Sequence, residues 1–538
     1  MIQATAGRPL HRLLAFLSVL SVSFLMLAGA AGAQVTPFTQ AVAEAASKDK
    51  AIAEFYKANG YKPIWTGKSG KDKARRKAFL QALEQADAHG LPTRRYDAEL
   101  VKSGLKAART ERDRGLLEVE MSRMFLQYAQ DIQSGVLVPS RVDKGIVREI
   151  PRRNRTQTLV AFSKSSPRGF IKQLPPKSAE YTRLMKEKLA LEKLLAKGGY
   201  GPKVPGKKLE PGMSGPQVVA LRNRLITLGY LKRSTSPVYD ADLQKAVQAF
   251  QQNHGLVADG IAGPGTLAEI NTSAEDRLKS VIVAMERERW MNRNRGSRHV
   301  WVNLTDFSAK IVDNGKVTFE TRSVIGKNTP DRRSPEFSDV MEFMVVNPTW
   351  NVPRSIATKE YLPMLKKNPN AVSHLKLINS KGQTVSRGSV NFNQFTARNF
   401  PFAMKQPPSR GNALGLVKFM FPNSHNIYLH DTPAKKLFSR ETRAFSHGCI
   451  RLAQPFEFAH ALLAKQTSDP EGTFKRALDS GKETRIDLKQ PIPVHIVYRT
   501  AVSQPKGPMQ YRRDVYGRDA KVFAALSEAG VSLRAVRG

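Results

Sequence analysis

The chain has 538 residues, of which 41% are hydrophobic, so it can bury a sizeable core and form about two to four domains. Its single cysteine excludes an internal disulfide. The formal net charge of +40 favours an anionic partner, which could be nucleic acid, anionic lipid or an anionic polymer. The plain alternative is a basic surface with no partner.

The first 33 residues have the pattern of a signal peptide. Arg8, His11 and Arg12 form a charged start, residues 13–27 form an apolar run, and residues 31–33 are a small-residue cleavage site. The run is short for a membrane span, and no later segment is apolar enough for one. We therefore expect an exported, periplasmic protein without a membrane span after cleavage, with an uncleaved anchor as the alternative. Export argues against nucleic acid and favours the bacterial cell wall, whose stem peptides carry free carboxylates.

Residues 34–205 are predicted to form a mainly helical domain. Apolar residues recur with a helical period over 41–59, 77–89 and 181–197. Between the last two runs, residues 148–176 are basic and broken by prolines, which is typical of a loop. No group of residues in this region has the pattern of a catalytic site.

Residues 206–272 are predicted to form a compact module of three short helices. Ser214 and Gln217 have the spacing of a capping box at the start of the first helix. The module resembles the peptidoglycan-binding domain found in many wall enzymes, on the runs Leu209 to Gly215, Val218 to Leu231, Ala246-Val247-Gln248-Ala249-Phe250-Gln251 and Gly255-Leu256-x-x-Asp259-Gly260-x-x-Gly263-x-x-Thr266. The alternative is a helical spacer that has lost binding.

The pattern changes to short strands in the second half of the chain. Strands are expected at 299–304, 309–312 and 340–346, and Asn314-Gly315 is a strong hairpin turn. Helical patterns follow at 452–464 and near 521–529. We expect residues after Tyr498 to be an irregular basic tail.

Cys449 lies in the run Ser446-His447-Gly448-Cys449-Ile450-Arg451, downstream of His430. If this run is extended, His447, Cys449 and Arg451 face one side. Tyr428 and His430 share a face of the upstream segment in the same way. If the two segments are neighbouring strands, His430 can therefore meet Cys449.

A thiol needs a base to attack a carbonyl at neutral pH, and His430 or His447 could take its proton. Arg451 could lower the thiol pKa, hold a substrate carboxylate or form a structural salt bridge. Gly448 leaves room for a substrate, and backbone N–H groups around Cys449 are candidates for an oxyanion hole.

This constellation resembles the L,D-transpeptidase family with the YkuD-type catalytic domain. His430 and Ser446-His447-Gly448-Cys449 match the family motif position by position, and Arg451 follows one variant in which other members carry asparagine. Resemblance to the large periplasmic YcbB-like subgroup extends over Phe55-Tyr56, Gly60-Tyr61, Pro63-x-Trp65, Val324-Ile325-Gly326, Thr329-Pro330, Asn347-Pro348-x-Trp350-x-Val352-Pro353, Asn412-Ala413-Leu414-Gly415-x-Val417-Lys418-Phe419, Pro422-Asn423 and His425-x-Ile427-Tyr428-Leu429-His430-Asp431-Thr432-Pro433.

Pattern and resemblance together predict an α+β multidomain fold. It comprises a helical scaffold at 34–205, the three-helix peptidoglycan-binding module at 206–272, a mainly β, sandwich-like catalytic domain at 285–498 and a basic tail at 499–538. The resemblance also implies an insertion at about 355–411 that caps the substrate cleft, either as a movable lid or as a rigid addition.

The resemblance implies a two-step acyl transfer on peptidoglycan that uses no cofactor and no metal. Cys449 attacks the bond between diaminopimelate and D-alanine in a tetrapeptide stem, and an amine of another stem resolves the thioester as a 3→3 cross-link. His430 is then the acid/base, the Asp431 carbonyl orients its ring, and His447 supports the thiolate or oxyanion region. Ser446 and Gly448 complete the catalytic motif, and the substrate-binding candidates are Arg451, Tyr428 and Asn412.

Other readings stay open at this point. Water as the acceptor would make an L,D-carboxypeptidase, and a protein amine would anchor protein to the wall. A zinc-dependent wall peptidase could use His425, His430, His447 and Cys449, all of which are residue types that bind zinc. A wall-binding adaptor without activity is the non-enzymatic reading, and a redox thiol lacks a second cysteine. Protein partners and oligomeric state are not readable from the sequence.

Overall fold

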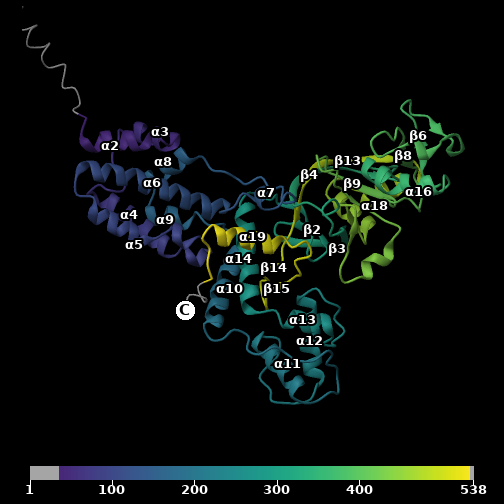
Figure 1. Cartoon of the computed structure of the whole chain (residues 1–538), viewed down its shortest axis with the longest axis horizontal. Helices are drawn as coiled ribbons and strands as arrows, with labels where there is room; N and C mark the ends of the chain where they lie inside the picture. Colours follow the sequence, from purple (N-terminus) through teal and green to yellow (C-terminus); the bar gives the residue numbers. More distant parts are fainter. Residues whose placement is uncertain (1–34, 534–538) are drawn as a thin grey trace, which may run out of the picture. The chain divides into compact units, whose positions relative to one another are not determined.

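The computed structural model describes residues 35–533, so the predicted signal peptide at 1–33 lies outside the described residues. The chain divides into two compact units (Figure 1). The first takes the described residues up to Glu84, with Asp97–Tyr128 and Arg153–Lys172. The second takes Gln85–Tyr96, Ala129–Arg152 and the described chain from Gln173 onward. The helical region predicted at 34–205 is therefore shared between the two units.

The first unit is helical, although two of its helices lie within residues 148–176, which we predicted as a loop. Its helices are α2 (Pro37–Ala46), α3 (Lys50–Ala58), α4 (Gly70–Glu84), α5 (Ala98–Ala107), the first part of α6 (Glu111–Ser134), α8 (Arg155–Lys164) and α9 (Pro167–Lys172). The run predicted as one helix at 41–59 is two helices, because Asp49 accepts the backbone N–H groups of Ala51 and Ile52 and so caps a new helix. The core is aromatic: the rings of Phe79, Phe125 and Phe162 lie 5.1–5.5 Å from that of Trp65.

Glu118 of α6 holds the loop that carries Trp65. Its fully buried carboxylate accepts the backbone N–H groups of Ile64, Trp65 and Thr66 at 2.6–3.0 Å and the Tyr56 hydroxyl at 2.8 Å. One buried side chain thereby satisfies backbone donors that would otherwise be costly to bury.

The peptidoglycan-binding-like module contains the three predicted helices, α11 (Pro216–Thr227), α12 (Ala241–Asn253) and α13 (Pro264–Ile270), around a core of its own. The predicted capping box is wrong. Gly215 occupies the N-cap with a φ of +119°, a conformation that favours glycine, and no side chain caps the helix. Pro216 follows at the first helical position, where its missing N–H costs nothing.

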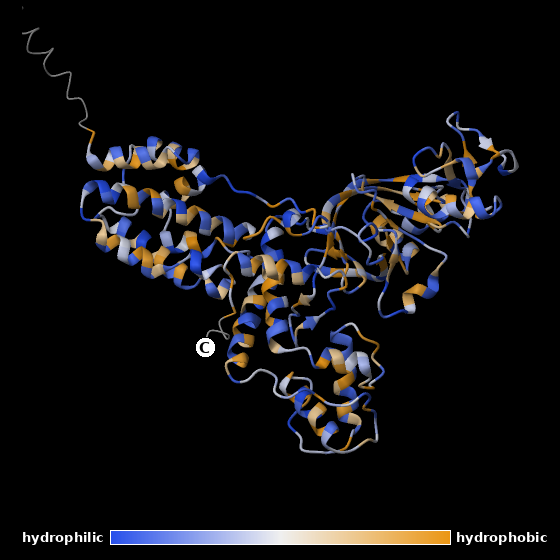
Figure 2. Ribbon diagram, viewed as in Figure 1, coloured by the Kyte–Doolittle hydropathy of each residue, from blue (hydrophilic) through white to orange (hydrophobic). Residues whose placement is uncertain are grey.

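A nine-stranded sheet forms the centre of the β-rich half, in the order β11-β3-β12-β10-β9-β4-β13-β1-β2. Its strands are β1 (Arg298–Asn303), β2 (Ser308–Asp313), β3 (Lys316–Gly326), β4 (Phe337–Val346), β9 (Val417–Met420), β10 (Leu429–His430), β11 (Ala444–Ser446), β12 (Ile450–Leu452) and β13 (Thr484–Val497). The β2–β3 pairing closes the sheet on itself. Its apolar side packs with α17 (Pro455–Leu463) and α18 (Pro470–Asp479) into one core, and orange strands mark that core in Figure 2.

The predicted capping insertion has its own sheet and its own core. Its strands are β5 (Trp350–Asn351), β6 (Lys376–Ile378), β7 (Thr384–Val385) and β8 (Ala403–Gln406), in the order β5-β8-β6-β7. Its helical part runs through α15 (Arg354–Ile356), a π-helical turn η3 (Ala357–Tyr361) and α16 (Leu362–Lys367). The chain leaves the main sheet after β4 and returns to it at β9.

The helix expected near 521–529 is present, but the rest of the segment after Tyr498 is not the irregular tail that we predicted. It forms β14 (Ala501–Val502), β15 (Gln510–Tyr511) and α19 (Arg518–Glu528), which share a core with α10 (Ala179–Leu195) and α14 (Ala274–Trp290). Its charges misled the prediction because several are buried in pairs: Arg518 lies 3.3 Å from Glu336, and Asp519 pairs with Arg287.

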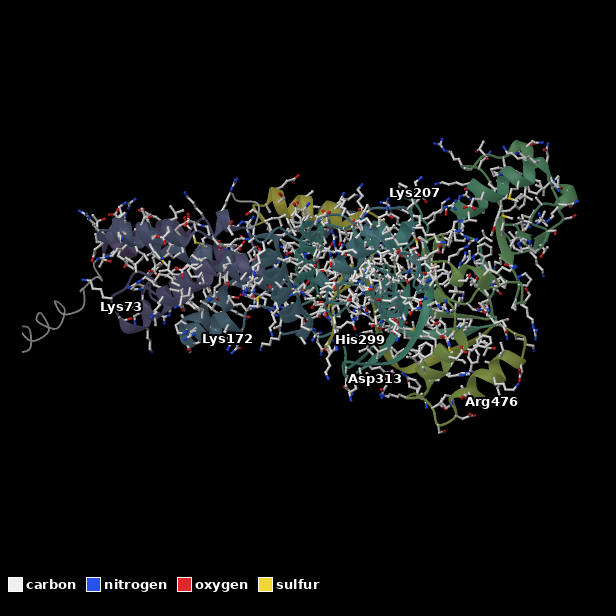
Figure 3. The ribbon with its side chains drawn as sticks, turned by 90° about the horizontal axis from the view of Figure 1, so that it is seen from below. Lys73, Lys172, Lys207, His299, Asp313 and Arg476 are labelled. Carbon is white, nitrogen blue, oxygen red and sulfur yellow. The ribbon has the colours of Figure 1, made fainter. Side chains whose placement is uncertain are left out.

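Several charged side chains elsewhere are exposed. Lys73 and Lys172 of the first unit, and Lys207 and Arg476 of the second, are solvent-facing (Figure 3). Among residues 35–533, no helix is long and apolar enough to cross a membrane.

Truncating a core residue of α19 tests whether the C-terminal segment is part of the fold. Leu526 is fully buried, so we expect Leu526→Ala to lower the free energy of unfolding by about 3 kcal/mol. The neighbouring exposed Ser527 provides the control, and Ser527→Ala should change it by less than about 0.5 kcal/mol. Urea unfolding followed by circular dichroism measures both. Equal urea midpoints for the two variants would mean that the C-terminal segment is an irregular tail after all.

Candidate active site

The two segments that carry the candidate residues are neighbouring strands. β10 and β12 pair in parallel, with Leu429 opposite Ile450 and His430 opposite Arg451. The Ile450 N–H donates to the Tyr428 carbonyl at 3.1 Å. Leu429 and Ile450 are buried in the sheet core, so alternation puts the residues on either side of them on the other face. The sheet therefore brings together the segments of His430 and Cys449, which lie far apart in sequence.

The run 446–452 is not one extended strand, contrary to our expectation. β11 pairs with one side of β3, where Ser446 lies opposite Gly326, and β12 pairs with the other side, where Arg451 lies opposite Val324. The chain between them crosses the end of β3, and Gly448 makes this crossing with a φ of +120°, which other residues rarely adopt. Strand alternation therefore does not align His447 with Cys449.

Two serines hold the crossing loop. Ser446 Oγ accepts the Gly448 N–H at 3.1 Å and donates to the Cys449 carbonyl at 2.5 Å. Ser334 Oγ donates to the Gly448 carbonyl at 2.6 Å and accepts the Gly326 N–H at 3.0 Å. Ser446 therefore braces the loop from within, while Ser334 ties it to the end of β3.

The Cys449 thiol is partly accessible and carries its proton. Its Sγ donates to the Asn426 carbonyl at 3.4 Å. Burial raises the pKa of the Cys449 thiol to about 11, although hydrogen bonds from Tyr428 and the charge of Arg451 act in the opposite direction. A resting thiolate is thus disfavoured at neutral pH.

His430 is buried and neutral. Its Nδ1 lies 2.5 Å from the Asp431 carbonyl oxygen, and because a carbonyl only accepts, Nδ1 carries the proton. Nε2 of the neutral ring is then free to accept. Burial and the charge of Arg451 lower the pKa of His430 to about 3, against the opposing effect of the Asp431 and Leu414 backbone. The contact with the Asp431 carbonyl is the one that the family resemblance implies.

His447 turns towards the capping insertion. Its Nε2 lies 2.7 Å from Glu360 Oε1, and the Arg332 guanidinium lies 2.7 Å from the same oxygen. Since a carboxylate only accepts, Nε2 carries a proton here. The His447 side chain is 36% exposed, whereas His430 is buried, so the two histidines have different surroundings.

The three substrate-binding candidates also differ. Burial and the neighbouring Cys449 raise the pKa of the Tyr428 hydroxyl, and its ring lies 5.6 Å from that of His430. Arg451 has no carboxylate within 4 Å among the described residues, and its buried Nε has no hydrogen-bond partner among them, so the salt-bridge reading gains no support.

Asn412 is fully buried. Its side-chain amide donates to the carbonyls of Pro348, Gln406 and Pro407 and accepts the Leu414 N–H. The amide is not available to a ligand in this arrangement.

The zinc reading lacks a ligand cluster. Across residues 35–533, no three His, Cys, Asp or Glu side chains are grouped as a metal ion requires. His425, the fourth candidate ligand, is exposed and packs edge-on against Phe337 at 5.2 Å.

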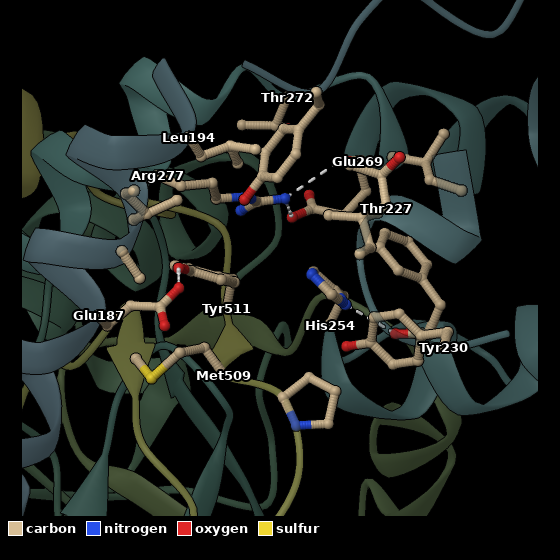
Figure 4. Close-up of a pocket in the computed structure, with 17 residues that line it drawn as sticks. Glu187, Leu194, Thr227, Tyr230, His254, Glu269, Thr272, Arg277, Met509 and Tyr511 are labelled. Atoms are coloured by element: carbon tan, nitrogen blue, oxygen red, sulfur yellow. Dashed lines mark hydrogen bonds and ion pairs between the residues drawn. The ribbon is translucent and has the colours of Figure 1, made fainter. Parts of the chain in front are cut away.

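A separate cavity of about 320 Å³ lies between the module, α10 and the C-terminal segment (Figure 4). Arg277 lies over the Tyr511 ring at 4.4 Å and pairs with Glu269 at 2.6 Å. Burial and the charge of Arg277 lower the pKa of His254 in this cavity to about 3. None of the lining residues belongs to the cysteine motif, so the cavity is distinct from the candidate site.

Sequence reasoning missed Ser334, Arg332 and Glu360. Glu360 and His447 are separated by 87 residues, and Ser334 and Gly448 by 114. The insertion predicted to cap the cleft was one indication of these contacts. That prediction did not say which residues of the insertion would reach the cysteine motif.

Three family models match the chain. Residues 297–486 match "L,D-transpeptidase catalytic domain", residues 214–270 match "Putative peptidoglycan binding domain" and residues 50–187 match "Scaffold domain". These matches confirm the predicted family at the level of the three domains, and with them the predicted fold class.

Curated relatives agree over parts of their length. The chain is 31% identical over 228 residues to "Putative L,D-transpeptidase" of Haemophilus influenzae, covering 42% of this chain and 45% of that protein. A 66-residue stretch is 41% identical to "N-acetylmuramoyl-L-alanine amidase CwlL" of Bacillus licheniformis, covering 12% and 18%. The chain thus spans less than half the length of these two relatives.

Among solved structures, the L,D-transpeptidase of Stackebrandtia nassauensis aligns with 55% of this chain and 97% of its own, at 14% identity and a TM-score of 0.22. So low a score adds nothing to the family match.

The thiol pKa can be measured because Cys449 is the only cysteine. With a pKa of about 11, the rate of alkylation by iodoacetamide should rise about tenfold per pH unit from pH 7 to about pH 10. Free cysteine, with a pKa of about 8.5, levels off earlier and is the control. Mass spectrometry of the intact protein gives the rates. A plateau already reached below pH 8 would mean that a thiolate–imidazolium pair exists at rest.

Proposed function

Because this chain belongs to the L,D-transpeptidases, with scaffold, peptidoglycan-binding and YkuD-type catalytic domains, we propose that it forms 3→3 cross-links in peptidoglycan. The observation that supports the proposal is the pairing of β10 with β12, which joins the strand that ends at His430 to the strand that directly follows Cys449. The reaction cleaves the diaminopimelate–D-alanine bond of a tetrapeptide stem and passes through a thioester on Cys449.

In the first step, His430 takes the Cys449 proton on Nε2 as the sulfur attacks the diaminopimelate carbonyl carbon. The Asp431 carbonyl fixes the tautomer that leaves Nε2 free. The resulting imidazolium returns the proton to the amine of D-alanine as the C–N bond breaks. D-alanine leaves, and a thioester remains on Cys449.

In the second step, the side-chain amine of diaminopimelate on another stem attacks the thioester. His430 accepts a proton from this amine, and the thiol is restored as the C–S bond breaks. A neutral resting pair suits both half-reactions, because His430 must start each of them unprotonated.

The N–H of Cys449 is the proposed oxyanion donor. The N–H groups of the two flanking residues already donate hydrogen bonds, that of Gly448 to Ser446 Oγ and that of Ile450 to the Tyr428 carbonyl. Gly448 also keeps the approach to this amide open, because a side chain there would meet Ile427 at 3.3 Å. Arg451, placed opposite His430, lowers the pKa of the thiol and favours the thiolate that develops during attack.

Peptidoglycan is the proposed partner, through both the module and the catalytic domain, in the periplasm. Stem peptides carry carboxylates, which complements the net charge of +40. Water or a protein amine as acceptor would instead make an L,D-carboxypeptidase or a protein-anchoring enzyme. A non-catalytic wall-binding adaptor is the remaining alternative.

Muropeptide analysis tests the reaction. The chain lacking residues 1–33 is incubated with tetrapeptide-rich peptidoglycan beside Cys449→Ala, and the products are identified by mass spectrometry. We expect 3→3 dimers only from the unmodified protein. Tripeptides without dimers would indicate a carboxypeptidase. Tight wall binding without any Cys449-dependent product would favour the adaptor.

Matched substitutions of the two histidines separate their roles. His430→Gln should lower the rate of thioester formation by about 10²-fold or more, because it removes the base. His447→Gln should lower it by less than about tenfold, because His447 faces Glu360 and not the thiol. Single-turnover acylation by a tetrapeptide measures both. The reverse order of the two effects would make His447 the base.

A further inference from the structure

Arg332, Glu360 and His447 form a polar cluster beside the loop that carries Cys449. One oxygen, Glu360 Oε1, accepts from both Arg332 and His447 at 2.7 Å. All three side chains are about one-third exposed, so the cluster is in contact with solvent. A carboxylate thus occupies a two-pronged donor site that a ligand can also reach.

The two donors stand on a fixed frame. Ser334, two residues after Arg332, bonds the Gly448 carbonyl and the Gly326 N–H, and its own carbonyl accepts from Arg518 at 2.9 Å. The Tyr516 hydroxyl donates to the Gly326 carbonyl at 2.6 Å. The loop of Arg332 is therefore tied to the loop that carries His447 by contacts that do not involve Glu360.

The acceptor comes from a different body of the fold. Glu360 lies in the π-helical turn of the capping insertion, which packs around its own apolar core. A π-helical turn is rare and is found often at functional sites. A partly exposed ion pair of this kind contributes little free energy, so Glu360 can be displaced at small cost.

We propose that Arg332 and His447 bind a carboxylate of the donor stem peptide, and that Glu360 occupies this site while the cleft is empty. The proposal rests on the proposed function. His447 is two residues from Cys449, so their Cα atoms lie within about 7 Å of each other. A stem whose scissile carbonyl is at Cys449 has carboxylates on the residues that flank that bond. One of them exchanges with Glu360, and this exchange releases the insertion from the catalytic loop.

The exchange couples recognition to movement of the insertion. Because one carboxylate replaces another, the donors keep an anionic partner throughout, and only the tie to the insertion is lost. A stem without that carboxylate cannot displace Glu360 and binds under a closed insertion, with weaker affinity. Arg332 and His447 thereby select for a free carboxylate beside the scissile bond.

Binding measured in a Cys449→Ala background tests the proposal without turnover. Isothermal titration with a disaccharide tetrapeptide should show about threefold to tenfold tighter binding for Glu360→Gln, which removes the competing charge. Arg332→Gln should weaken binding by a similar factor, and Arg332→Lys should restore part of it. Asp479→Asn removes an exposed ion pair with Lys475 on α18 and is the matched control, expected to change nothing.

Amidated stems identify which carboxylate binds. In one donor D-alanine is replaced by D-alaninamide, and in the other the side-chain carboxylate of diaminopimelate is amidated. The donor that lacks the recognised carboxylate should lose the gain given by Glu360→Gln and the loss given by Arg332→Gln. The other donor should keep both effects.

Three results would overturn the proposal: unchanged or weaker binding in Glu360→Gln, unchanged binding in Arg332→Gln, or equal gains with both amidated donors. The last would mean that Glu360 only latches the insertion. Failure of the proposed function gives a different result, because the Cys449→Ala protein would then bind no tetrapeptide donor and the unmodified chain would form no thioester.

Discussion

The parallel pairing of β10 with β12 is the constraint on which the candidate site depends. His430 ends one of these two short inner strands and Cys449 directly precedes the other, and buried Leu429 and Ile450 fix their register. A shift of one residue would turn both reactive side chains into the apolar core. The closed sheet and its helices therefore serve to hold a pairing of only two residues.

The resting state of that pair is neutral on both sides. Burial raises the pKa of Cys449 and lowers that of His430, so the proton stays on sulfur until a substrate arrives. A neutral thiol is a poor target for oxidants and adventitious electrophiles, since the thiolate is the reactive form. Reactivity then depends on the charge that develops during attack and on the donors that face it.

Local pattern predicted the parts of the structure that depend on local sequence. The helical periods, the three-helix module and the strand patterns were found, and the motif indicated Cys449 and His430 as neighbours. The local sequence pattern failed to predict features that depend on tertiary contacts. Gly448 breaks the run that alternation treated as one strand, paired charges bury Arg518 and Asp519 in the supposed tail, and Glu360 reaches His447 from a distant insertion. Asn412 was predicted to bind substrate from a motif match, but its side chain is hydrogen-bonded to the backbone and does not face the cleft.

The capping insertion begins and ends on strands that pair with each other. Val346 at the end of β4 lies opposite Val417 at the start of β9, so its two ends are separated by one strand spacing. A tight turn between these positions would leave the closed sheet whole. Segments of different length and composition can therefore be inserted between β4 and β9 without disturbing the pairing of these two strands. Replacement of the insertion can therefore change the group that competes for Arg332 and His447 without moving the strands that carry the reactive centre.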